Sequence, residues 1–158
     1  MFGYQLQTQI DELDWAILHA LQVNGRLSFS QIGRQVNASQ PTVAERVRRL
    51  EERGLITGYA ATVNRKLLGW PIMAFVRLTV PNYSTSQVDD IIRGMVEISE
   101  CHRVTGDDCL IIKLHARSME HLEASLKKLS RHGPTATSIA LSSIVTERMV
   151  EPPAEQAG

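Results

Sequence analysis

The stretch RLSFSQIGRQVNASQPTVAERVRRLEERGLI, residues 26–56, decides the fold of the first third of this chain. Ser28 and Gln31 have the spacing of a capping box, in which each side chain satisfies a backbone N–H that the first turn of a helix leaves unpaired. Ser39 is a favourable N-cap for a second helix, and Pro41 falls in its first turn, where a missing N–H costs nothing. The Asn-Ala-Ser between the two favours a turn. The stretch therefore predicts a helix-turn-helix.

The second helix has an apolar side and, beside it, a row of polar and basic side chains. Val43, Val47 and Leu50 repeat at i, i+4 and i+7, which predicts the side that packs on the preceding helices. Arginine can hold a phosphate bidentately or pair with a guanine edge, and Ser, Gln and Thr near the helix start suit base edges in the major groove. The predicted DNA-binding residues are Ser39, Gln40, Thr42, Arg46, Arg48, Arg49 and Arg53.

The same charges have a plainer interpretation as ion pairs on a solvated helix face. Glu45 with Arg49, and Arg48 with Glu52, have the i,i+4 spacing of such pairs. The preceding capped helix and tight turn favour contact with double-stranded DNA instead. The chain has no net charge, but residues 1–66 carry 8 Lys+Arg against 6 Asp+Glu. This mild excess predicts modest affinity per subunit, so several subunits would have to bind together.

A third helix precedes this pair, and a linker follows it. The helix is predicted by a helical apolar stripe and ends at Asn24-Gly25; the stripe consists of Leu13, Ile17, Leu18 and Leu21. After Gly54, residues 55–64 predict a β-strand broken by Gly58, which could form a wing-like ribbon or a tether. We therefore expect a trihelical, winged DNA-binding domain at 1–56 and a strand tether and linker at 57–72.

The second half alternates between strand and helix patterns. Strands are predicted at 73–80, 100–105, 110–116 and 135–145, and helices from Thr85 and after Ser118. The order β-α-β-β-α-β is that of a ferredoxin-like fold, with two helices on one face of a four-stranded antiparallel sheet. A second copy is the economical cover for the other face. The fold class is thus α+β, with an effector-binding and oligomerisation domain at 73–146 and a C-terminal tail at 147–158.

Several other functions are not expected. No apolar run is long enough to cross a bilayer, and the first residues lack the pattern of a signal peptide, so we expect a cytoplasmic protein. Cys101 and His102 are neighbours on a strand and point to opposite faces, and the other histidines lack ligand spacing. No phosphate-binding loop, nucleophile elbow or metalloprotease motif occurs. We expect no enzyme activity, no cofactor and no metal site.

The chain resembles the Lrp/AsnC, or feast/famine, family of bacterial and archaeal transcription regulators over nearly its whole length. The matching pieces are LDWAILHALQVNGRLS, SQPTVAERVRRLEERGLITGYAATVN, ECHRVTGDD and TATSIALSS. The resemblance implies a dimer that often assembles into tetramers or octamers, displays its N-terminal domains outward and binds amino acids between the effector domains. It implies a regulator whose DNA affinity or assembly responds to a small-molecule effector.

The family pattern also implies an effector site. It would take the hairpin turn and the last strand, here Thr105, Gly106, Asp107, Asp108, Thr135 and Thr137. Exposed turn amides can receive a ligand carboxylate, while Asp and Thr side chains can take its ammonium group. Many members have an aspartate where this chain has Cys109, and often an aromatic residue at Leu110. The lost carboxylate favours an apolar amino acid.

Two other functions stay open. One is an amino-acid-sensing regulatory subunit that does not touch DNA, since ferredoxin-like domains also serve that purpose. The other is an architectural DNA-binding protein without an effector. The first predicts no salt-dependent affinity for DNA, and the second predicts no amino acid that changes DNA binding or assembly.

Overall fold

The chain forms two compact units in a computed structural model that describes residues 10–80, 85–106 and 110–153. The helical unit comprises the described residues up to Thr62 together with residues 145–153. The sheet unit comprises the described residues of Val63–Ile144. Within the described ranges, no helix is long and apolar enough to cross a membrane.

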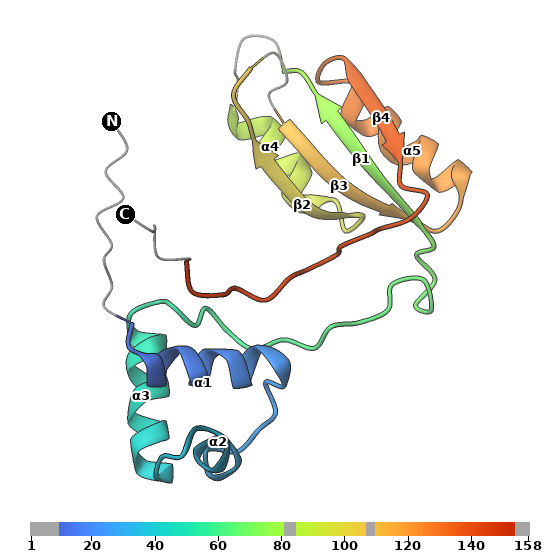
Figure 1. Cartoon of the computed structure of the whole chain (residues 1–158). Coiled ribbons are helices and arrows are strands. Elements are labelled where there is room, and N and C mark those ends of the chain that lie inside the picture. Colours follow the sequence, from blue (N-terminus) through green and yellow to red (C-terminus); the bar gives the residue numbers. More distant parts are fainter. Residues whose placement is uncertain (1–9, 81–84, 107–109, 154–158) are drawn as a thin grey trace. The chain divides into compact units, whose positions relative to one another are not determined.

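The helical unit is built from α1 (Glu12–Val23), α2 (Phe29–Val36) and α3 (Gln40–Glu52), as Figure 1 shows. One apolar side of each helix faces a common core. Its buried side chains are Ile17, Ala20, Ile32, Val43, Val47 and Leu50. The apolar spacings predict these core faces correctly, because a side chain that recurs every three or four residues returns to the same side of a helix.

Each helix of this unit begins at a side-chain cap. The Ser28 hydroxyl accepts from the Gln31 amide, and the Gln31 side chain accepts from the Ser28 amide at 2.8 Å, which confirms the predicted capping box. Ser39 caps α3 as predicted. A second capping box at α1 joins Asp11 and Asp14 and was not predicted. These caps satisfy amides that the first helical turn would leave without partners.

The turn between α2 and α3 is closed by two backbone features. Asn37 adopts the left-handed conformation at φ 54°, which asparagine tolerates better than most residues. The Ala38 amide donates to the Gly33 carbonyl at 2.9 Å. A Cβ atom on Gly33 would lie only 2.5 Å from the Ala38 carbonyl oxygen. The turn can therefore fold back this closely only because residue 33 is glycine.

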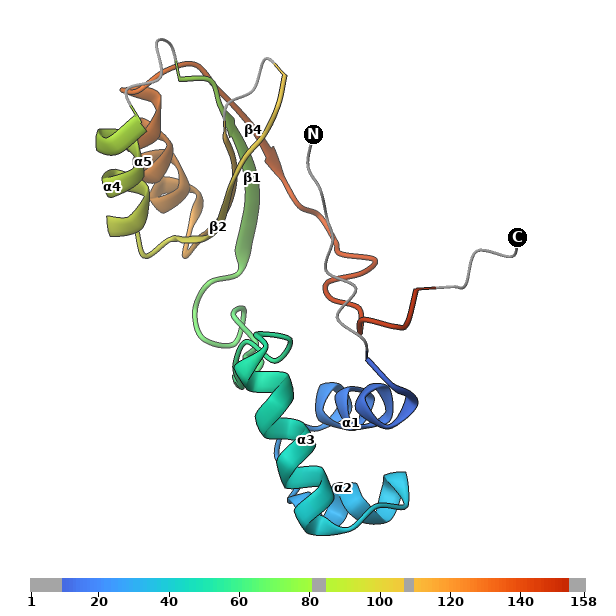
Figure 2. The same ribbon diagram turned by 90° about the vertical axis from the view of Figure 1, so that its left-hand side faces the viewer.

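The sheet unit has the predicted β-α-β-β-α-β order. The strands are β1 (Ile72–Leu78), β2 (Ile98–Arg103), β3 (Leu110–Ala116) and β4 (Thr135–Ile139), and the helices are α4 (Thr85–Gly94) and α5 (Met119–Ser130). All three strand pairs are antiparallel, in the order β2-β3-β1-β4. Figure 2 shows α4 and α5 together on one side of the sheet.

The helix-covered face of the sheet carries the core of this unit. On β1, Ala74, Val76 and Leu78 are buried, whereas Phe75 and Arg77 between them are exposed. Because side chains alternate across a strand, the exposed residues mark the opposite face, which we call the open face. Phe75 is 42 % exposed and pairs with Lys113 on β3 and Ser138 on β4.

Two boundary predictions are wrong. Residues 55–64 contain no strand, since a strand needs a neighbour for its N–H and C=O groups and none of the described strands pairs with this segment. β4 ends at Ile139 rather than at residue 145, and Ile144 is 99 % exposed. The helix predicted from Thr85 ends at Gly94, and Val96 beyond it is 81 % exposed.

The segment after the sheet returns to the helical unit. The Val150 amide donates to the Gln22 Oε1 atom at 2.8 Å, and Gln22 Nε2 donates to the Val150 carbonyl at 3.1 Å. The side-chain amide of Gln22 thus binds the backbone of residue 150 as a neighbouring strand would. Residues 147–158 are predicted from the sequence to form a C-terminal tail, and the described part of this tail belongs to the helical unit by its contacts.

Candidate nucleic-acid interface

The start of α3 presents polar side chains to solvent. Ser39, Gln40 and Thr42 are exposed, while the apolar side of the same helix is buried. The Ser39 hydroxyl accepts from the Thr42 amide at 3.2 Å and lies 2.7 Å from the Thr42 hydroxyl. Three predicted DNA-binding residues therefore lie on one exposed helix end, where Ser39 also has a structural role as cap.

Arg48 and Arg49 share a carboxylate on the exposed surface of α3. Arg48 contacts both oxygens of Glu45, at 2.8 and 2.9 Å, and also pairs with Glu52. Arg49 Nε donates to Glu45 Oε1 at 2.8 Å. Hydrogen bonds from Arg48 and Arg49 hold the pKa of Glu45 below its usual value. Both i,i+4 pairs of the plainer interpretation are thus present.

Ion pairs of this kind do not oppose nucleic-acid binding strongly. The side chains of Arg48 and Arg49 are 56 % and 58 % exposed. Pairs between such exposed groups contribute little to stability, because water and salt screen them and long side chains lose entropy. A phosphate can therefore replace Glu45 as the partner of either guanidinium at small cost.

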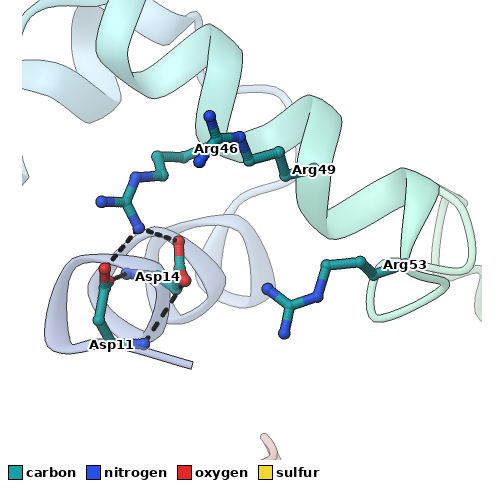
Figure 3. A pocket seen from close by; sticks show the side chains of 5 residues that line it. All are labelled: Asp11, Asp14, Arg46, Arg49 and Arg53. Carbon is teal, nitrogen blue, oxygen red and sulfur yellow. Dashed lines mark hydrogen bonds and ion pairs between the residues drawn. The ribbon is translucent and has the colours of Figure 1, made fainter. Parts of the chain in front are cut away.

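Arg46 lies differently from the other arginines of α3. Its guanidinium points to the first turn of α1 and contacts Asp11 and Asp14, the latter at 3.1 Å (Figure 3). Arg49 and Arg53 line the same notch between α1 and α3. The amide of Asp14 and the guanidinium of Arg46 hold the pKa of the Asp11 carboxyl below its usual value. Arg46 lies beside the apolar side of α3, as helical spacing predicts, but its partners come from the start of another helix.

The sheet unit contains the described part of the predicted effector site. Thr105 and Gly106 are exposed at the end of β2, while Asp107 and Asp108 lie outside the described residues, as does Cys109. The residues of the last strand do not adjoin this turn. Arg103, Leu110, Leu78 and Thr135 pair in succession across the sheet.

The register separates the two halves of the predicted effector site. Thr135 is at the same end of the sheet as the turn, but β1 lies between β3 and β4, a separation of about 10 Å at ordinary strand spacing. Thr135 and Thr137 pair with Leu78 and Val76, so their side chains share the helix-covered face. The single chain therefore does not bring the two groups together.

A buried charged cluster at the opposite end of the sheet was not predicted. Glu97 is 7 % exposed and contacts His121 Nε2 at 3.2 Å and Lys128 Nζ at 3.7 Å. Burial raises the pKa of Glu97, but its hydrogen bonds and the charges of Lys128 and His121 outweigh this and lower it. The Trp70 ring lies 5.8 Å from the ring of His121. These contacts tie the start of β1 and of β2 to α5, which indicates a stabilising role.

Two family models match the chain, one to each unit. Residues 10–51 match the AsnC-type helix-turn-helix domain. Residues 73–150 match the Lrp/AsnC ligand binding domain. The first match contains all three helices of the helical unit up to Glu51, and the second contains the four strands from Met73 onward.

The chain is similar to transcriptional regulators, and the similarity extends over most of the length of each protein. The regulator LrpC of Bacillus subtilis is 34 % identical over 139 residues, which are 88 % of this chain and 96 % of that protein. The leucine-responsive regulatory protein of Haemophilus influenzae is 31 % identical over 142 residues, 85 % of this chain and 86 % of that protein.

Solved structures have the same fold. The structure of B. subtilis LrpC aligns with a TM-score of 0.84 and covers 88 % of this chain and 99 % of that one. A feast or famine regulatory protein from M. tuberculosis, complexed with L-methionine, aligns with a TM-score of 0.83 at 27 % identity and covers 90 % of this chain and 99 % of that one.

Proposed function

Because this chain belongs to the Lrp/AsnC family of DNA-binding transcriptional regulators, we propose that α3 lies in the major groove and that an apolar amino acid controls assembly or DNA affinity. The observation that carries the DNA part is the exposed start of α3, with Ser39, Gln40 and Thr42 beside two exposed arginines. Gln and Thr suit base edges, and Arg suits phosphate or guanine.

The arginines have distinct expected roles along the groove. On binding to the duplex, Arg48 and Arg49 leave Glu45 and contact DNA phosphates. Arg53 extends the row of basic side chains to the end of α3. Each phosphate contact releases counterions, so affinity falls as salt rises. Residues 1–66 carry an excess of only two positive charges, so one subunit binds weakly, and a homodimer or larger assembly supplies the remaining affinity.

The effector proposal rests on the turn after β2 and on the relatives. The M. tuberculosis neighbour is complexed with L-methionine, an amino acid with an apolar side chain. We place the ligand of this chain at Thr105, Gly106, Asp107 and Asp108 with Thr135 and Thr137. Since β1 separates the turn from β4 within one sheet, the two groups meet only if a second subunit supplies one of them.

The DNA proposal is tested by salt-dependent binding. The probe is a 40-bp duplex selected from a random library by the full-length protein, with a scrambled duplex for comparison. Arg49→Ala should weaken binding and reduce the slope of log affinity against log salt by about 0.9, because one phosphate contact is lost. The matched control is Lys127→Ala, which removes an exposed cation of α5 and should leave the slope unchanged.

Two results would contradict the DNA proposal. Wild-type protein that binds no duplex at low salt would favour the amino-acid-sensing subunit. An Arg49→Ala variant with unchanged affinity for every sequence would remove that residue from the interface.

The effector proposal is tested by thermal unfolding of the full chain against each of the twenty amino acids, followed by sedimentation with any hit. An apolar amino acid should raise the unfolding temperature and shift the assembly state, since a ligand stabilises the state that it binds. No shift with any amino acid would favour the architectural alternative.

A further inference from the structure

The arginines of α3 divide into two kinds by their surroundings. Arg48 and Arg49 are more than half exposed and pair with carboxylates of their own helix. The Arg46 side chain is 29 % exposed and pairs with Asp11 and Asp14, which are 35 and 32 residues away. Figure 3 shows its guanidinium held between these two carboxylates. Arg46 therefore links α1 to α3, whereas Arg48 and Arg49 pair only with side chains of α3.

The two aspartates are themselves held in place. Asp11 is the N-cap of α1, its Oδ1 accepting from the Asp14 amide at 2.9 Å. The Asp14 side chain reaches back to the Asp11 amide and is only 7 % exposed. Both carboxylates also lie at the positive end of the α1 helix dipole, which favours negative charge there. Contacts within α1 therefore hold both carboxylates in place independently of Arg46.

Transfer of Arg46 to a DNA phosphate would be costly in this arrangement. It would leave the nearly buried Asp14 carboxylate without its cation, and an unpaired charge in such a position is strongly unfavourable. The exposed pairs of Glu45 carry no such penalty. A phosphate therefore competes well for Arg48 and Arg49 and poorly for Arg46.

The position of Arg46 suits a role in orienting α3. Arg46 comes one residue before Val47, about 100° away around the helix, and lies next to the side formed by the buried Val43 and Leu50. The apolar core allows some rotation of a helix about its axis, because hydrophobic contact is not directional. A guanidinium bonded to two fixed carboxylates is directional. The bridge thus limits the rotation of α3 that would displace Gln40 and Thr42.

We propose that Arg46 is a positioning residue that, through Asp11 and Asp14, fixes the orientation of α3 for base contacts and does not itself touch DNA. The inference rests on the proposed DNA-binding function and changes the role that the sequence predicted for Arg46.

The test uses Arg46→Met and Asp14→Asn in the full-length protein, with the same selected and scrambled duplexes. Both variants should bind the selected duplex roughly tenfold more weakly, the size of a coupling between contacting residues, with an unchanged salt slope. The double variant should be no weaker than either single one. Removal of a negative charge near DNA should by electrostatics alone strengthen binding. Weaker binding of the selected duplex by Asp14→Asn is therefore the result that distinguishes a positioning role from a purely electrostatic one.

Controls separate positioning from general stability. Binding is measured at a temperature where circular dichroism shows every variant fully folded, and Arg46→Lys should recover part of the affinity for the selected duplex, because lysine keeps the positive charge that pairs with the two aspartates. If Asp14→Asn does not fold, Asp11→Asn replaces it, because the Asp11 side chain is 49 % exposed. A lower unfolding temperature with unchanged affinity would overturn the inference.

The outcomes are distinct from those of the proposed function. A salt slope reduced by about 0.9 in Arg46→Met, with tighter binding by Asp14→Asn, would make Arg46 a phosphate contact and overturn the inference while DNA binding stands. Wild-type protein that binds no duplex would overturn both.

Discussion

Gly33 determines how close α2 can come to the turn that leads into α3. Its carbonyl accepts from the Ala38 amide, and there is no room for a side chain between the two. The pattern of capping and turn residues around it predicts the turn but not this contact.

Gly33→Ala should destabilise the helical unit by about 1–3 kcal/mol, the usual cost of forcing an extra group into a packed site. The new methyl group would lie 2.5 Å from the Ala38 carbonyl oxygen, and backbone cannot move aside as a flexible side chain can. Urea unfolding followed by circular dichroism measures the change. The matched control is Gly94→Ala at the end of α4, where an added Cβ atom would have no atom of another part of the structure within 4 Å. Equal stability of Gly33→Ala and wild type would contradict the packing described for this turn.

The helices of the helical unit depend on contacts at their ends as well as on their apolar sides. Each begins at a side-chain cap, and α1 also binds the returning C-terminal segment through Gln22. The two hydrogen bonds between Gln22 and Val150 are exposed, so each contributes modestly. They nevertheless hold the segment to the helical unit across 128 residues of sequence.

Val150→Pro should lower the stability of the helical unit by about 1 kcal/mol, because proline has no N–H to donate to Gln22. Hydrogen exchange of the amides of α1 provides the measurement, since it reports stability locally. Val150→Ala keeps the amide and is the control. The described contact would be refuted by equal exchange in the two variants.

The open face of the sheet is not covered by the two helices that pack on the sheet. The helices cover only one side, and Phe75 is exposed in the middle of the other, on the strand between β3 and β4. A second copy could cover this face, as the fold predicts. Such a dimer would also bring two helical units into one particle, which the modest charge of each requires for firm DNA binding.

Phe75→Asp should dissociate the homodimer that we propose, because it would bury a carboxylate at the interface at a cost of roughly 2 kcal/mol or more. Sedimentation velocity would then show a lower mass at micromolar protein, with weaker DNA binding as a consequence. Val96→Asp introduces the same charge at an exposed apolar residue between α4 and β2 and is the control. Unchanged sedimentation of Phe75→Asp would exclude the open face as the interface.

The amino-acid sequence alone determined both folds, because they depend on local patterns. Capping residues and apolar spacing identify α2 and α3, and strand patterns interrupted by two helical patterns identify the ferredoxin-like sheet. The strand predicted at residues 55–64 is absent, because a strand pattern specifies an extended chain but not the neighbour that must pair with it.

The tertiary structure alone decided which charged side chains meet across different helices. Helical spacing predicted the pairs of Glu45 with Arg49 and of Arg48 with Glu52, because those partners lie about one turn apart on the same helix. It could not predict the bridge from Arg46 to Asp11 and Asp14, since that bridge requires the packing of α1 on α3. The register of the sheet likewise separated Thr135 from the turn after β2. Short-range geometry follows from sequence order, whereas contacts across many residues depend on how the elements pack.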